Sequence, residues 1–167
     1  PPWKGGIPQG IESSNLSASA RMKKYLIAFL VLIAVAILAY AALPKEADIT
    51  ALRAITIGGV SVSVEVADTA SLREQGLSGR SDLPKGQGML FVFDTDGAWG
   101  IWMKDMQFPI DIVWADASGT VITVAANVAP ETYPEVFNPS APARYVLELP
   151  AGFAAAHGIV EGTVIKI

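Results

Sequence analysis

A run of 19 residues without a charged side chain, residues 25–43, most constrains how this chain folds. As an α-helix rising about 1.5 Å per residue, it spans about 28 Å, close to the ~30 Å hydrocarbon core of a bilayer. Arg21, Lys23 and Lys24 stand directly before it, and basic residues mark the end that stays in the cytoplasm. The run therefore predicts an inner-membrane anchor, with the rest of the chain in the periplasm or outside the cell.

The same run is also compatible with a secretory signal. Ala39 and Ala41 form an A-x-A pattern, which is typical of a cleavage site, and cleavage would release a secreted domain. The length of the apolar run favours the uncleaved anchor, which would make the membrane a partner through residues 25–43. A buried core helix is disfavoured because no polar residue marks a second face.

This run divides the chain into segments. Residues 1–21 are rich in Pro, Gly and Ser, and we expect a disordered tag or extension ahead of Met22. Residues 22–43 are the anchor or signal, residues 44–51 a polar linker, and residues 52–167 one domain.

Charge and composition exclude several function classes. Residues 44–167 hold 8 Lys/Arg against 15 Asp/Glu, a net charge of −7, which disfavours nucleic acid as a partner. Cysteine is absent, so disulfides and thiolate metal sites are excluded. His157 is the single histidine, so a zinc site built from several histidines is excluded too. We expect no metal and no cofactor.

The domain has the pattern of a mainly β protein. Gly58-Gly59 separates two alternating runs and predicts a tight hairpin, and Asp68-Thr69 with Gly76 predicts a short capped helix over residues 70–75. A second short helix is expected over residues 150–156. Turns are expected at residues 94–97 and 116–119, and a long loop at 129–142. Strands are expected at residues 52–57, 60–66, 89–93, 101–106, 110–115, 120–128, 143–149 and 163–167. The fold class is a small antiparallel or mixed β-barrel with one or two short helices.

Several segments in order resemble a known family. They are REQGLSGRSDLP, GQGMLFVF, IWMKDMQFPIDIVWADASGTVI and PARYVLELPAGFAAAHGIVEGTVI. Together they resemble the DUF192 family, also called UPF0127, over about residues 60–165. The resemblance implies a small, largely β domain, often behind a signal or anchor, and implies no established activity. The chain departs from the family at Ser78, where Met is usual, and at Asp105-Met106, where Asn-Thr is usual.

The link between two expected core strands is the candidate site. Phe91 and Trp114 belong to strands and are expected in the core, whereas Pro109 interrupts strand pairing between them. We hypothesise that the Arg80 loop, the 102–105 segment and the Tyr133 loop converge on a ligand. The candidate ligand-binding residues are Arg80, Trp102, Lys104, Asp105, Asp111 and Tyr133.

The favoured function is therefore a binding or accessory module for a small polar molecule, a glycan or a protein segment. One alternative is an envelope glycan hydrolase, because Asp105 and Asp111 could divide acid and base roles if burial separated their pKa values. Another is a structural protein that pairs through an exposed sheet edge. No motif identifies a catalytic residue, so an enzyme is not the expectation.

Overall fold

The computed structural model describes residues 12–41 and 52–167. The chain divides into two compact units, Pro1–Ile49 and Thr50–Ile167, and each is described by itself. The expected linker, residues 44–51, and the first eleven residues of the expected extension lie outside the described residues.

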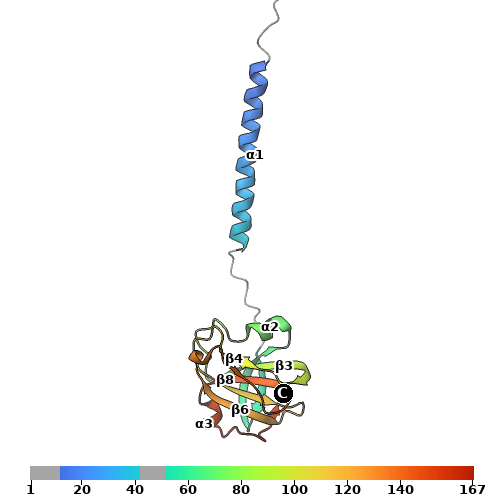
Figure 1. Ribbon diagram of the computed structural model, residues 1–167, viewed down its shortest axis with the longest axis vertical. Coiled ribbons are helices and arrows are strands. Elements are labelled where there is room, and N and C mark those ends of the chain that lie inside the picture. The colour runs from blue at the N-terminus through green and yellow to red at the C-terminus, as the bar shows by residue number, and fades with distance from the viewer. Residues whose placement is uncertain (1–11, 42–51) are drawn as a thin grey trace, which may run out of the picture. The chain divides into compact units, whose positions relative to one another are not determined.

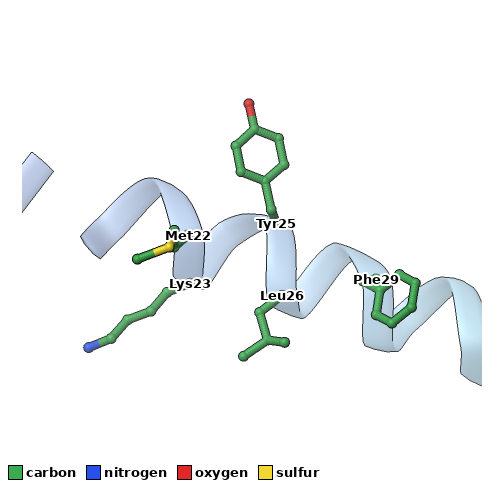
Figure 2. Close-up of a pocket in the computed structure, with 5 residues that line it drawn as sticks. All are labelled: Met22, Lys23, Tyr25, Leu26 and Phe29. Atoms are coloured by element: carbon green, nitrogen blue, oxygen red, sulfur yellow. The ribbon is translucent and has the colours of Figure 1, made fainter. Parts of the chain in front are cut away.

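The first unit contains one long helix, α1 (Glu12–Ala41), which takes in residues 12–21 of the expected extension. The large apolar side chains of residues 22–36 are exposed, with Tyr25 at 75%. Figure 2 shows five side chains along a shallow groove of this helix, with Tyr25 and Leu26 pointing to opposite sides. Within residues 12–41 and 52–167, no helix is long and apolar enough to cross a membrane.

The second unit is mainly β (Figure 1). In its described residues, seven strands form one sheet in the order β6-β5-β8-β3-β2-β1-β9, and β4 pairs with β7 in a separate two-stranded sheet. Neighbouring strands are antiparallel, except β2 and β3, which are parallel. The strands are β1 (Arg53–Ile57), β2 (Val60–Ala67), β3 (Gln87–Gly97), β4 (Ile101–Trp102), β5 (Ile110–Ala115), β6 (Val121–Val128), β7 (Val136–Phe137), β8 (Ala143–Pro150) and β9 (Ile165–Lys166). The helices are α2 (Ala70–Gln75), the 3-10 turn η1 (Pro130–Thr132) and α3 (Phe153–Ala156).

The sheet curls into a half-barrel whose two edge strands meet at one end. Thr120 forms a bridge with Val164, and the Ile165 amide donates to the Gly119 carbonyl at 2.8 Å. Gly119 has a φ of +82°, and a Cβ there would lie 2.5 Å from the Ile165 carbonyl oxygen. Only glycine therefore permits this contact. The expected mainly β, mixed sheet is confirmed, in this curled form.

The sheet is covered on both faces, which explains the uninterrupted apolar runs in the sequence. Leu90 and Val113 belong to one core cluster, whereas Phe91 and Trp114 belong to another. Because successive strand residues point to opposite faces, a strand between two cores is apolar at every position. All six residues of β5 are buried, and five of them are apolar, with Asp111 as the exception. The expected burial of Phe91 and Trp114 is confirmed.

The sequence correctly predicted two elements that depend on neighbouring residues, a hairpin and a capped helix. The hairpin pairs Ile57 with Val60 around Gly58-Gly59, both of which have positive φ. The Thr69 hydroxyl accepts a hydrogen bond from the Leu72 amide at 3.2 Å and so caps α2, as expected.

Several expected elements differ from the structure. The expected long loop at 129–142 contains η1 and β7, and the expected strand at 163–167 is limited to β9. The expected turn at 94–97 is wrong, because β3 continues to Gly97 after a register shift past Val92. The expected strand at 101–106 is limited to β4, which pairs outside the main sheet. The expected helix at 150–156 begins only at Phe153.

Candidate functional site

Four neighbouring strands place one row of residues side by side across the sheet. Glu65 of β2 pairs with Met89 of β3, Met89 pairs with Glu148 of β8, and Glu148 pairs with Ile112 of β5. Residues paired across neighbouring strands point to the same face. The two glutamates therefore lie on one face with Met89 between them, about 9–10 Å apart at two strand spacings.

Arg80 reaches this face from the loop after α2 and pairs with Glu65. Both terminal nitrogens of Arg80 contact the Glu65 carboxylate, one of them at 2.7 Å. The hydrogen bond from Arg80 lowers the pKa of Glu65, and the same bond raises the pKa of Arg80. Arg80 and Glu65 are thus a charged, bidentate pair at neutral pH.

Glu148 is buried and incompletely paired. Its residue exposure is 5%, and its Oε2 atom has no hydrogen-bond partner among residues 12–41 and 52–167. Burial raises the pKa of the Glu148 carboxyl to about 8, and the nearby charge of Arg80 only partly offsets this. The carboxyl is therefore mostly the neutral acid at neutral pH.

A small pocket gives access to Glu148. Its volume is about 140 Å³, comparable with cavities of about 150 Å³ that hold a benzene-sized molecule. The walls come from the end of α2, the turn that follows it, β3 and β4, and Figure 1 shows α2 and β4 at the same end of the unit. The lining residues are Arg73, Glu74, Gln75, Gly76, Leu77, Ser78, Phe91, Gly100, Ile101, Trp102, Met106 and Glu148.

Glycine residues permit the close packing around this pocket. Gly76 ends α2 with a φ of +51°, and a Cβ there would lie 3.3 Å from Cζ of Phe91. Gly88 lies beside the acid, because a Cβ there would approach the Glu148 carbonyl oxygen to 2.7 Å. Because glycine has no side chain, Gly76 and Gly88 let the turn after α2 pack against β3, and β3 against β8.

The loop that carries Arg80 is fixed to the segment after β4. The Ser78 hydroxyl donates to the Lys104 carbonyl at 2.8 Å, and the Gly79 amide donates to the Asp105 carbonyl at 2.9 Å. Asp105 has a φ of +57°, a conformation that Asp tolerates better than most residues. These bonds tie the expected Arg80 loop to the expected Lys104–Asp105 segment.

Trp102 lines the pocket and packs against a second aromatic side chain outside it. The Trp102 side chain is 50% exposed and meets Tyr133 edge-to-face, with ring centroids 5.8 Å apart. The Lys104 ammonium lies 5.8 Å from the centre of the Trp102 ring, within cation–π range. Lys104 and Tyr133 therefore both contact Trp102.

Asp111 lies in different surroundings. It is fully buried, and its Oδ1 atom accepts hydrogen bonds from the Asn127 and Gly152 amides at 2.7 and 3.1 Å. Its Oδ2 atom accepts from the Ala154 amide at 2.8 Å. Asp111 therefore joins β5 to the start of α3, and its oxygens are already used by the backbone.

Sequence reasoning missed Glu148 as a site residue. The signal was a single acid in the strand sequence YVLELP, between two leucines that are fully buried. A lone carboxylate inside an apolar strand requires a partner or a raised pKa. The sequence did not show that its neighbour would be Arg80.

No metal site accompanies the pocket. In the part of the chain that the structure describes, no group of three or more His, Asp or Glu side chains is placed to hold a metal ion.

Comparison with known proteins identifies the family. The model of DUF192, described as "Uncharacterized ACR", matches residues 53–167. A crystal structure of a candidate transcription regulator from Sinorhizobium meliloti 1021 is similar, with a TM-score of 0.64 and 30% identity over 68% of this chain and 91% of that one. A protein of unknown function from Novosphingobium aromaticivorans DSM 12444 has a TM-score of 0.67 and 27% identity, over 76% of this chain and 94% of that one. No curated protein matches the chain. The chain belongs to the DUF192 family, which its sequence motifs already resembled.

Proposed function

We propose that the Thr50–Ile167 unit is a binding domain that holds a small molecule in the pocket between α2, β3 and β4. One observation carries this proposal: Glu148 lines the pocket, and its buried Oε2 atom has no partner among the described residues. Leaving a buried polar group unpaired costs roughly 1–3 kcal/mol. A ligand that supplied the missing hydrogen bond would recover this energy.

The rest of the pocket supports binding of a ligand with an apolar part. Phe91 is a buried aromatic wall, and Trp102 is an exposed aromatic side chain at the mouth. Ligand sites typically combine apolar and aromatic walls with a few polar groups that fix orientation. Glu148 is the polar group inside, and Tyr133 beside Trp102 extends the aromatic surface outward.

We do not propose the glycan hydrolase. Both oxygens of Asp111 accept backbone hydrogen bonds, and Asp105 is exposed. Paired-carboxylate hydrolysis needs two carboxyl groups facing one substrate, and Asp111 is occupied in joining β5 to α3. Association through a sheet edge also has less support, because β6 and β9 contact each other at one end.

DNA binding is not part of the proposal either. The description as a candidate transcription regulator belongs to the Sinorhizobium relative. Residues 44–167 of this chain carry a net charge of −7, whereas affinity for DNA depends on neutralising phosphates with Lys and Arg.

Thermal unfolding of the full chain tests the proposal. The panel contains amines, amides, alcohols and carboxylates of about five heavy atoms, a size that fits the pocket. At about ten times its Kd, a ligand stabilises the folded state by about 1.4 kcal/mol, which raises Tm by a few degrees. We expect at least one compound to do so, and Glu148→Gln and Trp102→Ala to remove the effect.

Glu161→Gln is the matched control, because it makes the same chemical change at an exposed glutamate outside the pocket. It should keep the full rise in Tm. The proposal fails if no compound raises Tm, or if Glu148→Gln responds as the parent chain does.

We also propose that the chain is held at the membrane by the apolar run, or exported by it. Support comes from the uncharged residues 25–43, the basic residues before them and the exposed apolar side chains of α1. Cell fractionation tests this. An anchored chain stays with membranes after an alkaline wash, and an exported chain appears outside the cytoplasm in a shortened form. Full-length chain in the cytoplasmic fraction would contradict both.

A further inference from the structure

Two carboxyl groups share one guanidinium on the pocket face of the sheet. Glu65 and Glu148 lie in the same row, and Arg80 gives both of its terminal nitrogens to Glu65. Burial raises the pKa of Glu148 and the charge of Arg80 partly offsets this rise, but within the described residues Arg80 donates no hydrogen bond to the Oε2 atom of Glu148. Arg80 neutralises Glu65, so an ionised Glu148 would need a second positive charge beside it.

The other basic groups near the pocket are engaged elsewhere. The Arg73 guanidinium donates to the Asp68 and Val92 carbonyls at 2.7 and 2.8 Å, and it lies 5.2 Å from the centre of the Phe93 ring. The Lys104 ammonium lies over Trp102. Neither makes a contact with Glu148 in the described part of the chain, and the exposed Glu74 adds a further acid to the pocket lining.

We propose that the pocket binds a small organic cation, with an alkylammonium group against the Glu148 carboxylate and the alkyl part between Phe91 and Trp102. This inference rests on the proposed binding function and adds the chemical class of the ligand. An ammonium group supplies both the hydrogen-bond donor and the positive charge that Glu148 lacks.

Binding of such a cation exchanges a proton. The empty pocket holds Glu148 mostly as the neutral acid, whereas the ion pair requires the carboxylate. An alkylammonium keeps its charge up to about pH 10, as lysine does. Cation binding therefore releases the Glu148 proton to solvent, and the affinity rises with pH until Glu148 is ionised without a ligand.

The experiment uses the full chain with ¹⁵N-labelled tryptophan, and follows the Trp102 indole signal during titrations. The probes are n-butylammonium, 1-butanol and butyrate, which have similar size but positive, zero and negative charge. Titrations at constant ionic strength up to about 50 mM cover the millimolar affinity expected for so small a ligand. The buried Trp114 indole, which donates to the Trp99 carbonyl at 2.7 Å, reports on the integrity of the fold.

We expect butylammonium to shift the Trp102 signal with a Kd at least about tenfold below that of 1-butanol, and butyrate not to bind. Glu148→Gln should remove this preference, and Glu161→Gln should keep it. Between about pH 6 and pH 7 the Kd of butylammonium for the parent chain should fall about ninefold, because the ionised fraction of Glu148 rises by that factor. This last result needs no variant and stands even if Glu148→Gln does not fold.

The outcomes separate this inference from the proposed function. If 1-butanol binds as tightly as butylammonium and affinity does not change with pH, the cation is wrong and the small-molecule pocket stands. If no probe shifts the Trp102 signal, the inference is wrong, and the Tm panel decides on the pocket itself.

Discussion

Replacing Glu148 with glutamine should change how the stability of the fold depends on pH. Burial raises the pKa of this carboxyl from an ordinary value of 4.5 to about 8. Below pH 4.5, both the folded and the unfolded chain hold the proton, so the full stability is present. Between pH 4.5 and about 8 only the unfolded chain loses the proton, so the free energy of unfolding falls as pH rises.

The magnitude follows from the gap between the two pKa values. One pH unit corresponds to about 1.4 kcal/mol for one proton, so the total loss over the roughly 3.5 pH units between 4.5 and about 8 is on the order of 5 kcal/mol. Glu148→Gln has no proton to lose at this position. The free energy of unfolding of the parent chain minus that of the variant should therefore decrease by about 1.4 kcal/mol per pH unit between about pH 5 and pH 8.

Urea unfolding at several pH values, followed by tryptophan fluorescence, measures this difference. The pKa values of Glu65 and Asp116 are lowered by their hydrogen bonds, so those groups titrate below this pH window. Glu161→Gln, at an exposed site, should differ from the parent chain by an amount that is constant with pH. A constant difference for Glu148→Gln as well would refute a buried, neutral Glu148.

Three other variants test the surroundings of the pocket and the sheet. Asp111→Asn should cost about 2–4 kcal/mol in urea unfolding, because a carboxylate that accepts three amides is lost; a cost below about 0.5 kcal/mol would contradict that role. Arg80→Met should raise the pKa of Glu148 further, since the offsetting charge is removed. A ¹³C titration of the glutamate carboxyls measures this, and an unchanged or lower pKa would be inconsistent with the charge effect of Arg80 on Glu148. Gly76→Ala should cost about 1–2 kcal/mol, because φ is +51° and the new methyl meets Phe91; an unchanged Tm would count against this account of the turn.

Elements governed by neighbouring residues were predictable from the sequence. The hairpin at Gly58-Gly59 and the capped helix after Thr69 depend on positive φ at glycine and on a hydroxyl cap. Those requirements act within a few residues, so the sequence displays them directly.

Long-range pairing was not predictable in the same way. The parallel pairing of β2 with β3 and the position of β8 between β3 and β5 join segments that are distant in the chain. This topology sets Glu65, Met89 and Glu148 in one row and brings Arg80 beside them. Glu148 could therefore be noticed as an acid in an apolar strand, but its role depends on the sheet order.

The candidate site likewise has residues that the sequence indicated and residues whose role depends on the folded chain. Trp102 and Lys104 could be noticed because they stand close together in the sequence outside the core strands, whereas the contact between Trp102 and Tyr133 joins distant segments. Asp111 was chosen by its nearness in sequence to Lys104. Its carboxylate instead binds amides of Asn127, Gly152 and Ala154, which only the folded chain brings to it.

The central claim is that Glu148 is the ligand-binding group of the pocket, and its carboxyl carbon reports on this directly. In a full chain with ¹³C-labelled glutamate, the Glu148 carboxyl signal at about pH 7 should start near the position of a protonated acid, because its pKa is about 8. Titration with n-butylammonium should move this signal to the ionised position and saturate together with the Trp102 indole shift. A Glu148 signal that stays at the protonated position while the Trp102 signal saturates would contradict the claim.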